Sequence, residues 1–128
     1  MVQLHLPIRP CLIVFEGIDG SGKTTIINLL KHDCEKGLFR SIFTREPGGS
    51  VVGEKIRKLL LNDVDSEQES PLTRLLLFMA SRSSNFDKTI KPALEVGSLA
   101  ISDRLDASTF AFQLWGGECR ELKKVFYS

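Results

Sequence analysis

The sequence lacks the features that mark membrane, secreted and metal-cluster proteins. Its longest apolar run, Leu75 to Ala80, is far too short to span a bilayer. The first ten residues contain no apolar core of the kind found in signal peptides. The three cysteines lie far apart and form no C-x-x-C pair, which favours reduced thiols over disulfides or a thiolate metal site. We therefore expect a cytoplasmic protein with no membrane segment.

An excess of charge of one sign is also missing. Seventeen basic and sixteen acidic residues leave a formal net charge of +1, so no strong field favours a nucleic acid or a membrane surface as partner. The content of 42% hydrophobic and 26% charged residues is typical of a globular protein. No repeat, low-complexity segment or linker divides the chain, and we expect residues 1–128 to form a single domain.

The most informative stretch present is a glycine-rich sequence between an apolar run and a helical pattern. It satisfies the phosphate-binding pattern G-x-x-x-x-G-K-[ST]. Glycines allow successive backbone N–H groups to turn toward one point, and the start of the following helix adds unpaired N–H groups. A chance match in a strand-to-helix turn is the alternative. The residues expected to bind a nucleotide polyphosphate are Gly17, Ile18, Asp19, Gly20, Ser21, Gly22, Lys23, Thr24 and Thr25.

Within this pattern, two side chains have specific expected roles. Lys23 would reach the β- and γ-phosphates, and the Thr24 hydroxyl would bind Mg²⁺. Asp103 ends a later apolar strand, where a carboxylate suits a metal ligand, although a strand-end cap is the plainer interpretation. Phosphoryl transfer depends mainly on positioned charges, so Lys23, Asp103 and Arg104 are the catalytic candidates.

The order of expected elements predicts an α/β fold of the P-loop NTPase type. Apolar strands alternate with amphipathic helices, which favours a parallel sheet of about three strands with helices on both faces. Pro92 is expected to kink or break its helix. The expected strands are 12–15, 41–44 and 98–102. The expected helices are 22–35, 52–61, one beginning at Ser70-Pro71, 85–96, 106–115 and one from 118.

Polar and charged residues follow all three expected strands. Because the carboxyl ends of parallel strands meet at one edge, the phosphate loop, Arg45-Glu46-Pro47 and Asp103-Arg104 should share a crevice. Arg57, Arg82 and Arg104 are candidates for holding an acceptor's phosphate, although each alone would usually be a solvated arginine. Phe78 could stack on a base, but its apolar neighbours favour a place in the core.

Four motifs, in order, resemble the thymidylate kinase family. They cover about residues 11 to 117, and the glycine-rich loop alone would not distinguish this family from others. The motifs are Phe15-Glu16-Gly17-Ile18-Asp19-Gly20-Ser21-Gly22-Lys23-Thr24-Thr25, Thr44-Arg45-Glu46-Pro47-Gly48-Gly49, Leu77-Phe78-Met79-Ala80-Ser81-Arg82, and Asp103-Arg104 with Ser108 and Ala111-Phe112-Gln113.

The resemblance implies ATP with Mg²⁺ as phosphate donor and thymidine monophosphate (dTMP) as acceptor, in a homodimer formed through the helices after the second strand. Phe78 would stack on thymine and Arg82 would bind the base edge. Arg57 and Arg104 would hold the acceptor phosphate, with Glu46 near the sugar–phosphate end and Asp19 beside the acceptor. Thr109 and Gln113 occupy the positions of polar contacts to the base.

The sequence also departs from the family pattern. Leu105 replaces an aromatic residue, Phe112 replaces a tyrosine, and Gly20 stands where some members carry a catalytic arginine. Family members continue for roughly another half-length with further strands and a lid, so we expect a fragment or a naturally short form. Without a lid arginine and with water entering the site, phosphoryl transfer should be slow. The first strand should lie near an open sheet edge.

Of four alternatives, two remain open and two are disfavoured. A nucleotide-binding module without catalysis, and another nucleoside or nucleotide kinase, both stay possible. A GTPase is disfavoured because the sequence contains neither an N-K-x-D stretch nor a D-x-x-G after the second or third strand. An AAA-type ATPase would end its strand in Asp-Glu, whereas this strand ends in Asp103-Arg104.

Overall fold

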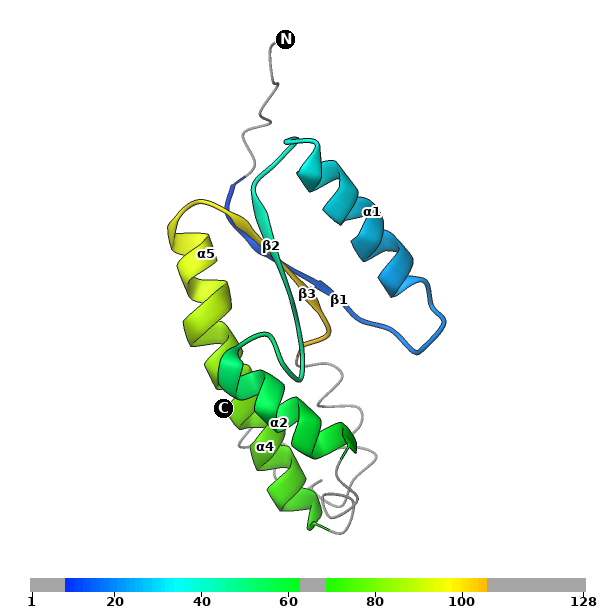
Figure 1. The fold of residues 1–128 in the computed structure, drawn as a ribbon, viewed down its shortest axis with the longest axis vertical. Coiled ribbons are helices and arrows are strands. Elements are labelled where there is room, and N and C mark those ends of the chain that lie inside the picture. The colour runs from blue at the N-terminus through cyan, green and yellow to red at the C-terminus, as the bar shows by residue number, and fades with distance from the viewer. Residues whose placement is uncertain (1–8, 63–68, 106–128) are drawn as a thin grey trace.

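A computed structural model describes residues 9–62 and 69–105. Figure 1 shows a small sheet with helices on either side of it. This arrangement confirms the expected α/β architecture. The expected helices after residue 105 lie outside the described residues, as do Thr109 and Gln113. The elements are β1 (Leu12–Phe15), α1 (Lys23–Glu35), β2 (Ser41–Arg45), α2 (Val51–Asn62), α4 (Pro71–Asn85), η1 (Phe86–Ile90), α5 (Lys91–Glu95) and β3 (Leu99–Asp103).

The three strands are parallel, in the order β1-β3-β2. β3, the last in sequence, is therefore the central strand, and β1 lies at one edge of this three-stranded sheet, as expected. Their final residues are aligned, since Asp103 pairs with Phe15 on one side and with Arg45 on the other. The segments that follow the three strands consequently leave the sheet at the same edge, which confirms the predicted convergence.

The hydrophobic core surrounds β3. Leu99, Ala100 and Ile101 are buried, as is the polar Ser102, because helices cover both faces of the central strand. Figure 1 shows α1 on one side of the sheet and α5 on the other. Burial on both faces accounts for the three consecutive apolar residues from Leu99 to Ile101.

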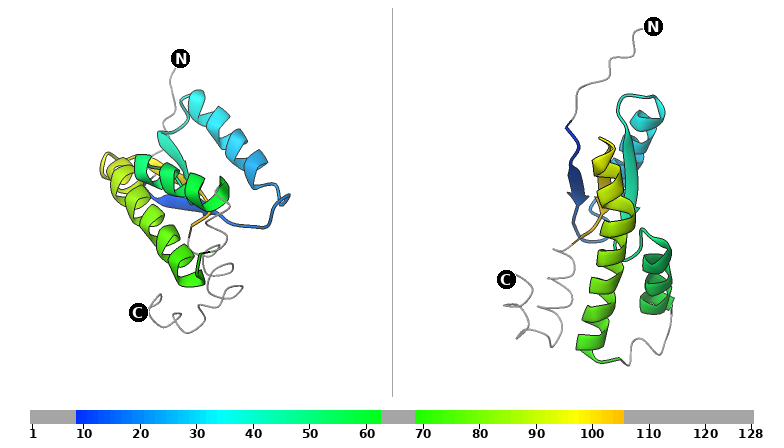
Figure 2. Two further views of the ribbon diagram at one scale, coloured as in Figure 1. Left: turned by 60° about the horizontal axis from the view of Figure 1, so that its bottom comes forward. Right: turned by 90° about the vertical axis from the view of Figure 1, so that its left-hand side faces the viewer.

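Pro92 does not interrupt the long helical stretch that ends at Glu95. The chain remains helical from α4 through η1 into α5 (Figure 2), but η1 is a π-helix. Proline has no N–H to donate to the carbonyl of Lys88, and its ring would crowd that carbonyl. The widened turn, in which the Lys91 N–H bonds to the Phe86 carbonyl, accommodates the ring without breaking the helix.

α2 packs alongside α4 (Figures 1 and 2). The start of α4 follows the sequence expectation, because the Ser70 hydroxyl accepts a hydrogen bond from the Thr73 N–H at 3.1 Å and Pro71 occupies the first turn.

Across the described residues, no helix combines the length and the apolar character that crossing a membrane would require.

Candidate functional site

The glycine-rich loop wraps toward the N-terminus of α1. Gly20 and Gly22 adopt positive φ angles of 80° and 90°, which side chains with a Cβ rarely tolerate. Gly22 is also the N-cap of α1 and has no side chain with which to cap it. The first N–H groups of the helix therefore face the loop, where an anion can accept from them and interact with the positive end of the helix dipole.

Lys23 folds back over this loop. Its Nζ donates to the carbonyl oxygens of Gly17 at 2.7 Å and Ile18 at 3.1 Å. The ammonium group is thereby held on the inner side of the turn, close to the helix N-terminus. Because an ammonium has three donors that rotate freely, it can also hydrogen-bond phosphate oxygens from this position.

The loop and the end of β3 line a common cavity of about 500 Å³. The cavity brings seven of the nine expected donor-binding residues, all but Gly17 and Ile18, together with two of the three arginines expected to hold the acceptor's phosphate. Its lining residues are Asp19, Gly20, Ser21, Gly22, Lys23, Thr24, Thr25, Arg57, Asp103 and Arg104. Cationic side chains and helix N–H groups around one cavity make the site suited to a polyphosphate.

Asp103 has an unusual environment in this cavity. Its Oδ1 is buried and accepts no hydrogen bond from the described residues, and a buried acceptor without a donor is costly. Thr24 lines the same cavity. No group of three or more His, Cys, Asp or Glu side chains in the described part could hold a metal. Mg²⁺ needs no such group, since it binds through one or two carboxylates with water and phosphate oxygens. Thr24 and Asp103 fit that requirement.

Arg104 and Arg57 approach the cavity from different elements. Arg104 Nη2 lies 2.9 Å from Asp19 Oδ1 in the glycine-rich loop. Arg57, on α2, donates to the Pro47 carbonyl at 2.8 Å. Burial, followed by repulsion from Arg45, lowers the pKa of Arg57 below its ordinary value. A partly buried cation destabilised in this way would be stabilised by a phosphate anion.

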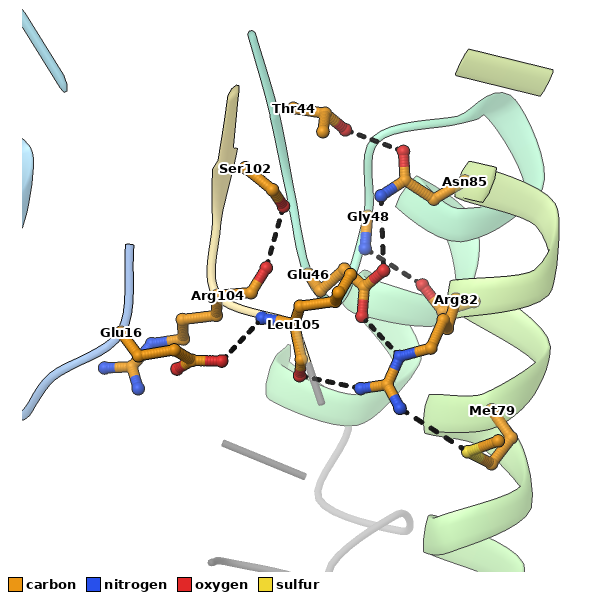
Figure 3. A network of polar contacts seen from close by, with 11 residues as sticks. Glu16, Thr44, Glu46, Gly48, Met79, Arg82, Asn85, Ser102, Arg104 and Leu105 are labelled. Carbon is orange, nitrogen blue, oxygen red and sulfur yellow. Dashed lines mark hydrogen bonds and ion pairs between the residues drawn. The ribbon is translucent and has the colours of Figure 1, made fainter. Parts of the chain in front are cut away.

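The acceptor residues expected on α4 lie on the other side of the strand ends. Arg82 Nε forms an ion pair with Glu46 Oε2 at 2.8 Å, and its Nη2 donates to the Leu105 carbonyl at 2.7 Å (Figure 3). Phe78 lies one helical turn before Arg82, on the same side of α4, and is half-buried. The base-binding roles of Arg82 and Phe78 remain predictions, as does the role of Glu46.

Sequence reasoning missed the polar residues that hold the Arg45–Gly49 loop against α4. Thr44 Oγ1 donates to Asn85 Oδ1 at 2.6 Å (Figure 3). The Gly48 N–H donates to Ser81 Oγ at 2.9 Å. Ser81 and Asn85 are both fully buried. Residues 81–85 are all polar, so no spacing in the sequence distinguished this buried face from a solvent-exposed one.

Comparison with known proteins gives a consistent family. A family profile described as "Thymidylate kinase" matches residues 15–125. The chain is 46% identical over 101 residues to the thymidylate kinase of Mycoplasma capricolum, covering 79% of this chain and 47% of that protein. It is 42% identical over 113 residues to that of Bdellovibrio bacteriovorus, covering 88% of this chain and 52% of that protein. The chain thus spans about half the length of the curated relatives it matches.

A solved structure agrees with the sequence relatives. The crystal structure of thymidylate kinase from Ehrlichia chaffeensis superimposes with a TM-score of 0.74 at 38% sequence identity. The similarity covers 90% of this chain and 66% of that structure. Profile, sequence and fold therefore point to the same assignment, and it agrees with the four motifs identified in the sequence. The chain belongs to the thymidylate kinase family.

Proposed function

We propose that this chain binds ATP and dTMP and transfers the γ-phosphoryl group of ATP to dTMP, forming ADP and thymidine diphosphate. The observation that carries the proposal is the single cavity in which the glycine-rich loop meets Asp103, Arg57 and Arg104. A donor polyphosphate and an acceptor phosphate need adjacent cationic sites, and this cavity supplies both.

The donor side of the proposed site consists of the loop backbone, Lys23 and Thr24. The N–H groups at the start of α1 would donate hydrogen bonds to the phosphate oxygens, and Lys23 would exchange its loop carbonyl partners for phosphate oxygens. Thr24 and Asp103 would hold Mg²⁺, which when bound neutralises negative charge on the β- and γ-phosphates. Asp103 provides the buried oxygen for this purpose.

The acceptor side consists of cations near the loop and residues of α4. Arg104 and Arg57 would bind the dTMP phosphate. Arg104 would also stabilise the negative charge that develops on the transferred phosphoryl group. Asp19 forms an ion pair with Arg104 in this structure, and its side chain would move when the acceptor binds. Phe78 would stack on thymine and Arg82 would bind its edge, with Glu46 orienting Arg82.

We also propose a homodimer in the cytoplasm. Several large apolar side chains of α2 and α4 are exposed, and exposed apolar surface favours association. Among the most exposed are Val51 at 79%, Leu61 at 57% and Leu76 at 59%. The homodimer that the family resemblance implies would use these two helices. Sedimentation velocity of the purified chain would test this assembly, and a concentration-independent monomer would contradict it.

The proposed reaction is tested by ADP release with dTMP as acceptor, compared with the monophosphates of the other nucleosides. We expect ADP formation to depend on dTMP and on Mg²⁺. Lys23→Met should abolish it, whereas Lys36→Met, at the exposed end of α1, should leave it unchanged. Saturable ATP binding without ADP release would support a binding module instead. A preference for another monophosphate would support a different nucleotide kinase.

A further inference from the structure

The backbone of Leu105, the residue that follows Arg104, is held from two sides. The Leu105 N–H donates to Glu16 Oε1 at 2.8 Å, and the Leu105 carbonyl accepts from Arg82 Nη2 at 2.7 Å (Figure 3). Glu16 directly follows β1 and directly precedes the glycine-rich loop. A single carboxylate therefore ties the end of the edge strand to the chain leaving the central strand, over a sequence separation of 89 residues.

The residue that this contact flanks has a strained backbone. Arg104 has a φ of 71°, and it is the only non-glycine residue with positive φ in the described part of the chain. For a residue with a Cβ this conformation is unfavourable and persists only where the surroundings impose it. Two further bonds act here: the Arg104 N–H donates to the Phe15 carbonyl at 2.9 Å, and the buried Ser102 hydroxyl donates to the Arg104 carbonyl at 2.7 Å.

We propose that Glu16 is a positioning residue for Arg104. Its carboxylate fixes the peptide that follows Arg104, maintains the left-handed backbone, and so aims the guanidinium at the phosphate-loop cavity, where it meets Asp19 at 2.9 Å. The contact is geometric: any acceptor oxygen at the position of Oε1 suffices. For its effect on the acceptor, the inference rests on the proposed function, in which Arg104 binds the phosphate of dTMP.

A purely electrostatic role for Glu16 makes a different prediction. A carboxylate near the cavity would repel phosphates, so removing its charge would strengthen binding of both nucleotides. Two substitutions distinguish the effect of the length of the Glu16 side chain from the effect of its charge. Glu16→Gln keeps the length and an acceptor oxygen but loses the charge. Glu16→Asp keeps the charge but is one methylene shorter and cannot reach the Leu105 N–H without backbone movement.

The test measures two properties of the wild-type chain, Glu16→Gln and Glu16→Asp, with the exposed Glu35→Asp as the matched control. The first is hydrogen exchange of the Leu105 amide without ligand. The second is calorimetric binding of dTMP and of ATP. We expect Glu16→Asp to speed Leu105 exchange and weaken dTMP binding, each by about tenfold, as loss of one hydrogen bond implies. ATP affinity should change less than about twofold, and Glu16→Gln should resemble the wild type.

Each outcome is decisive. Equal Leu105 exchange in the wild type and Glu16→Asp would overturn the inference, as would loss of Leu105 protection in Glu16→Gln. If Glu16→Asp does not fold, Glu16→Gln still tests the inference, because loss of Leu105 protection in that variant would overturn it. If the wild type does not bind dTMP while the Leu105 exchange pattern is as expected, the proposed function fails but the positioning of the Arg104 backbone by Glu16 stands.

Discussion

Glu46 and Arg82, 36 residues apart in the sequence, form an ion pair with Nε and Oε2 2.8 Å apart. Their side chains are only 5% and 16% exposed. The Asn85 side chain lies 3.4 Å from the other carboxylate oxygen. The pair connects the loop after β2 to α4, and Arg82 extends it to the Leu105 carbonyl after β3. The ends of two strands are thereby joined through one guanidinium group.

Removing the largely buried Arg82 should cost far more stability than removing Arg45, whose ion pair is exposed. Arg82→Met leaves the Glu46 carboxylate buried without its cation, for which a loss of about 3–5 kcal/mol is expected. Arg45→Met breaks the pair with Glu54, whose side chains are 50% and 38% exposed, and should cost less than about 1 kcal/mol. Urea unfolding measures both. Similar losses would contradict the prediction, and Glu46→Gln combined with Arg82→Met should recover part of the loss.

Gly49→Ala should destabilise the chain more than Gly97→Ala. Both glycines have positive φ, 75° and 80°. A Cβ at Gly97 meets no atom within 4 Å, so only backbone strain of about 1–2 kcal/mol is expected. A Cβ at Gly49 would collide with the side chains of Thr44 and Asn85, which adds a steric cost of about 1–3 kcal/mol. Thermal unfolding of the two variants checks the order, and equal melting temperatures would refute it.

Glu54 should make stability depend on pH below about 4.5. Hydrogen bonds from Arg45, and then from the Gly49 N–H, lower the pKa of Glu54 from 4.5 to about 2. A carboxyl group whose pKa is lower in the folded state stabilises the fold above its unfolded pKa. That contribution is therefore present above pH 4.5 and is lost as the pH falls toward 2. Because the side chain is 38% exposed, solvent screening keeps the effect small.

Glu54→Gln is the measurement that isolates this contribution. Urea unfolding between pH 5 and pH 2 should show a weaker pH dependence in Glu54→Gln than in the wild type, since the variant has no carboxyl group to protonate at this position. The exposed Glu95→Gln serves as the control. An unchanged pH profile in Glu54→Gln would show that the Arg45 and Gly49 contacts do not stabilise the ionised form.

Asp103→Asn should selectively weaken the effect of Mg²⁺ on ATP binding. The substitution preserves the shape of the side chain but removes the charge of the buried Oδ1, the oxygen that would serve as a metal ligand. Calorimetric titration of ATP with and without Mg²⁺ should show the metal-dependent gain in the wild type and in the exposed Asp87→Asn control, and its loss in Asp103→Asn. A full gain in Asp103→Asn would exclude this carboxylate as a ligand.

Much of the fold followed from local patterns. The glycine-rich loop, the Ser70-Pro71 helix start and the three apolar strands depend on neighbouring residues, so their sequence periods and turn residues identified them. The π-helical segment did not follow, because two outcomes fit the same local sequence: Pro92 can break a helix or be absorbed by a wider turn. Packing of Ile90 and Ala93 in the core favours the continuous helix.

The candidate site likewise has features that the sequence predicted and features that it did not. Lys23 and Thr24 were predicted from their spacing within the loop, and the cavity contains both. The contact between Glu16 and Leu105 could not be predicted, since β3 had first to be inserted between β1 and β2. Nor did any pattern show that the Asp103 Oδ1 would be buried without a hydrogen-bond donor.

The amino-acid sequence by itself determined the phosphate-binding turn and the family, because glycine conformations and helix starts are set by residues adjacent in the chain. Only the tertiary structure decided which charged and polar groups meet: Glu46 with Arg82, Asp19 with Arg104, and Glu16 with the Leu105 amide. These contacts join residues 36 to 89 positions apart. The order of the strands and the packing of α4 bring them together, and neither is encoded in any short stretch of the chain.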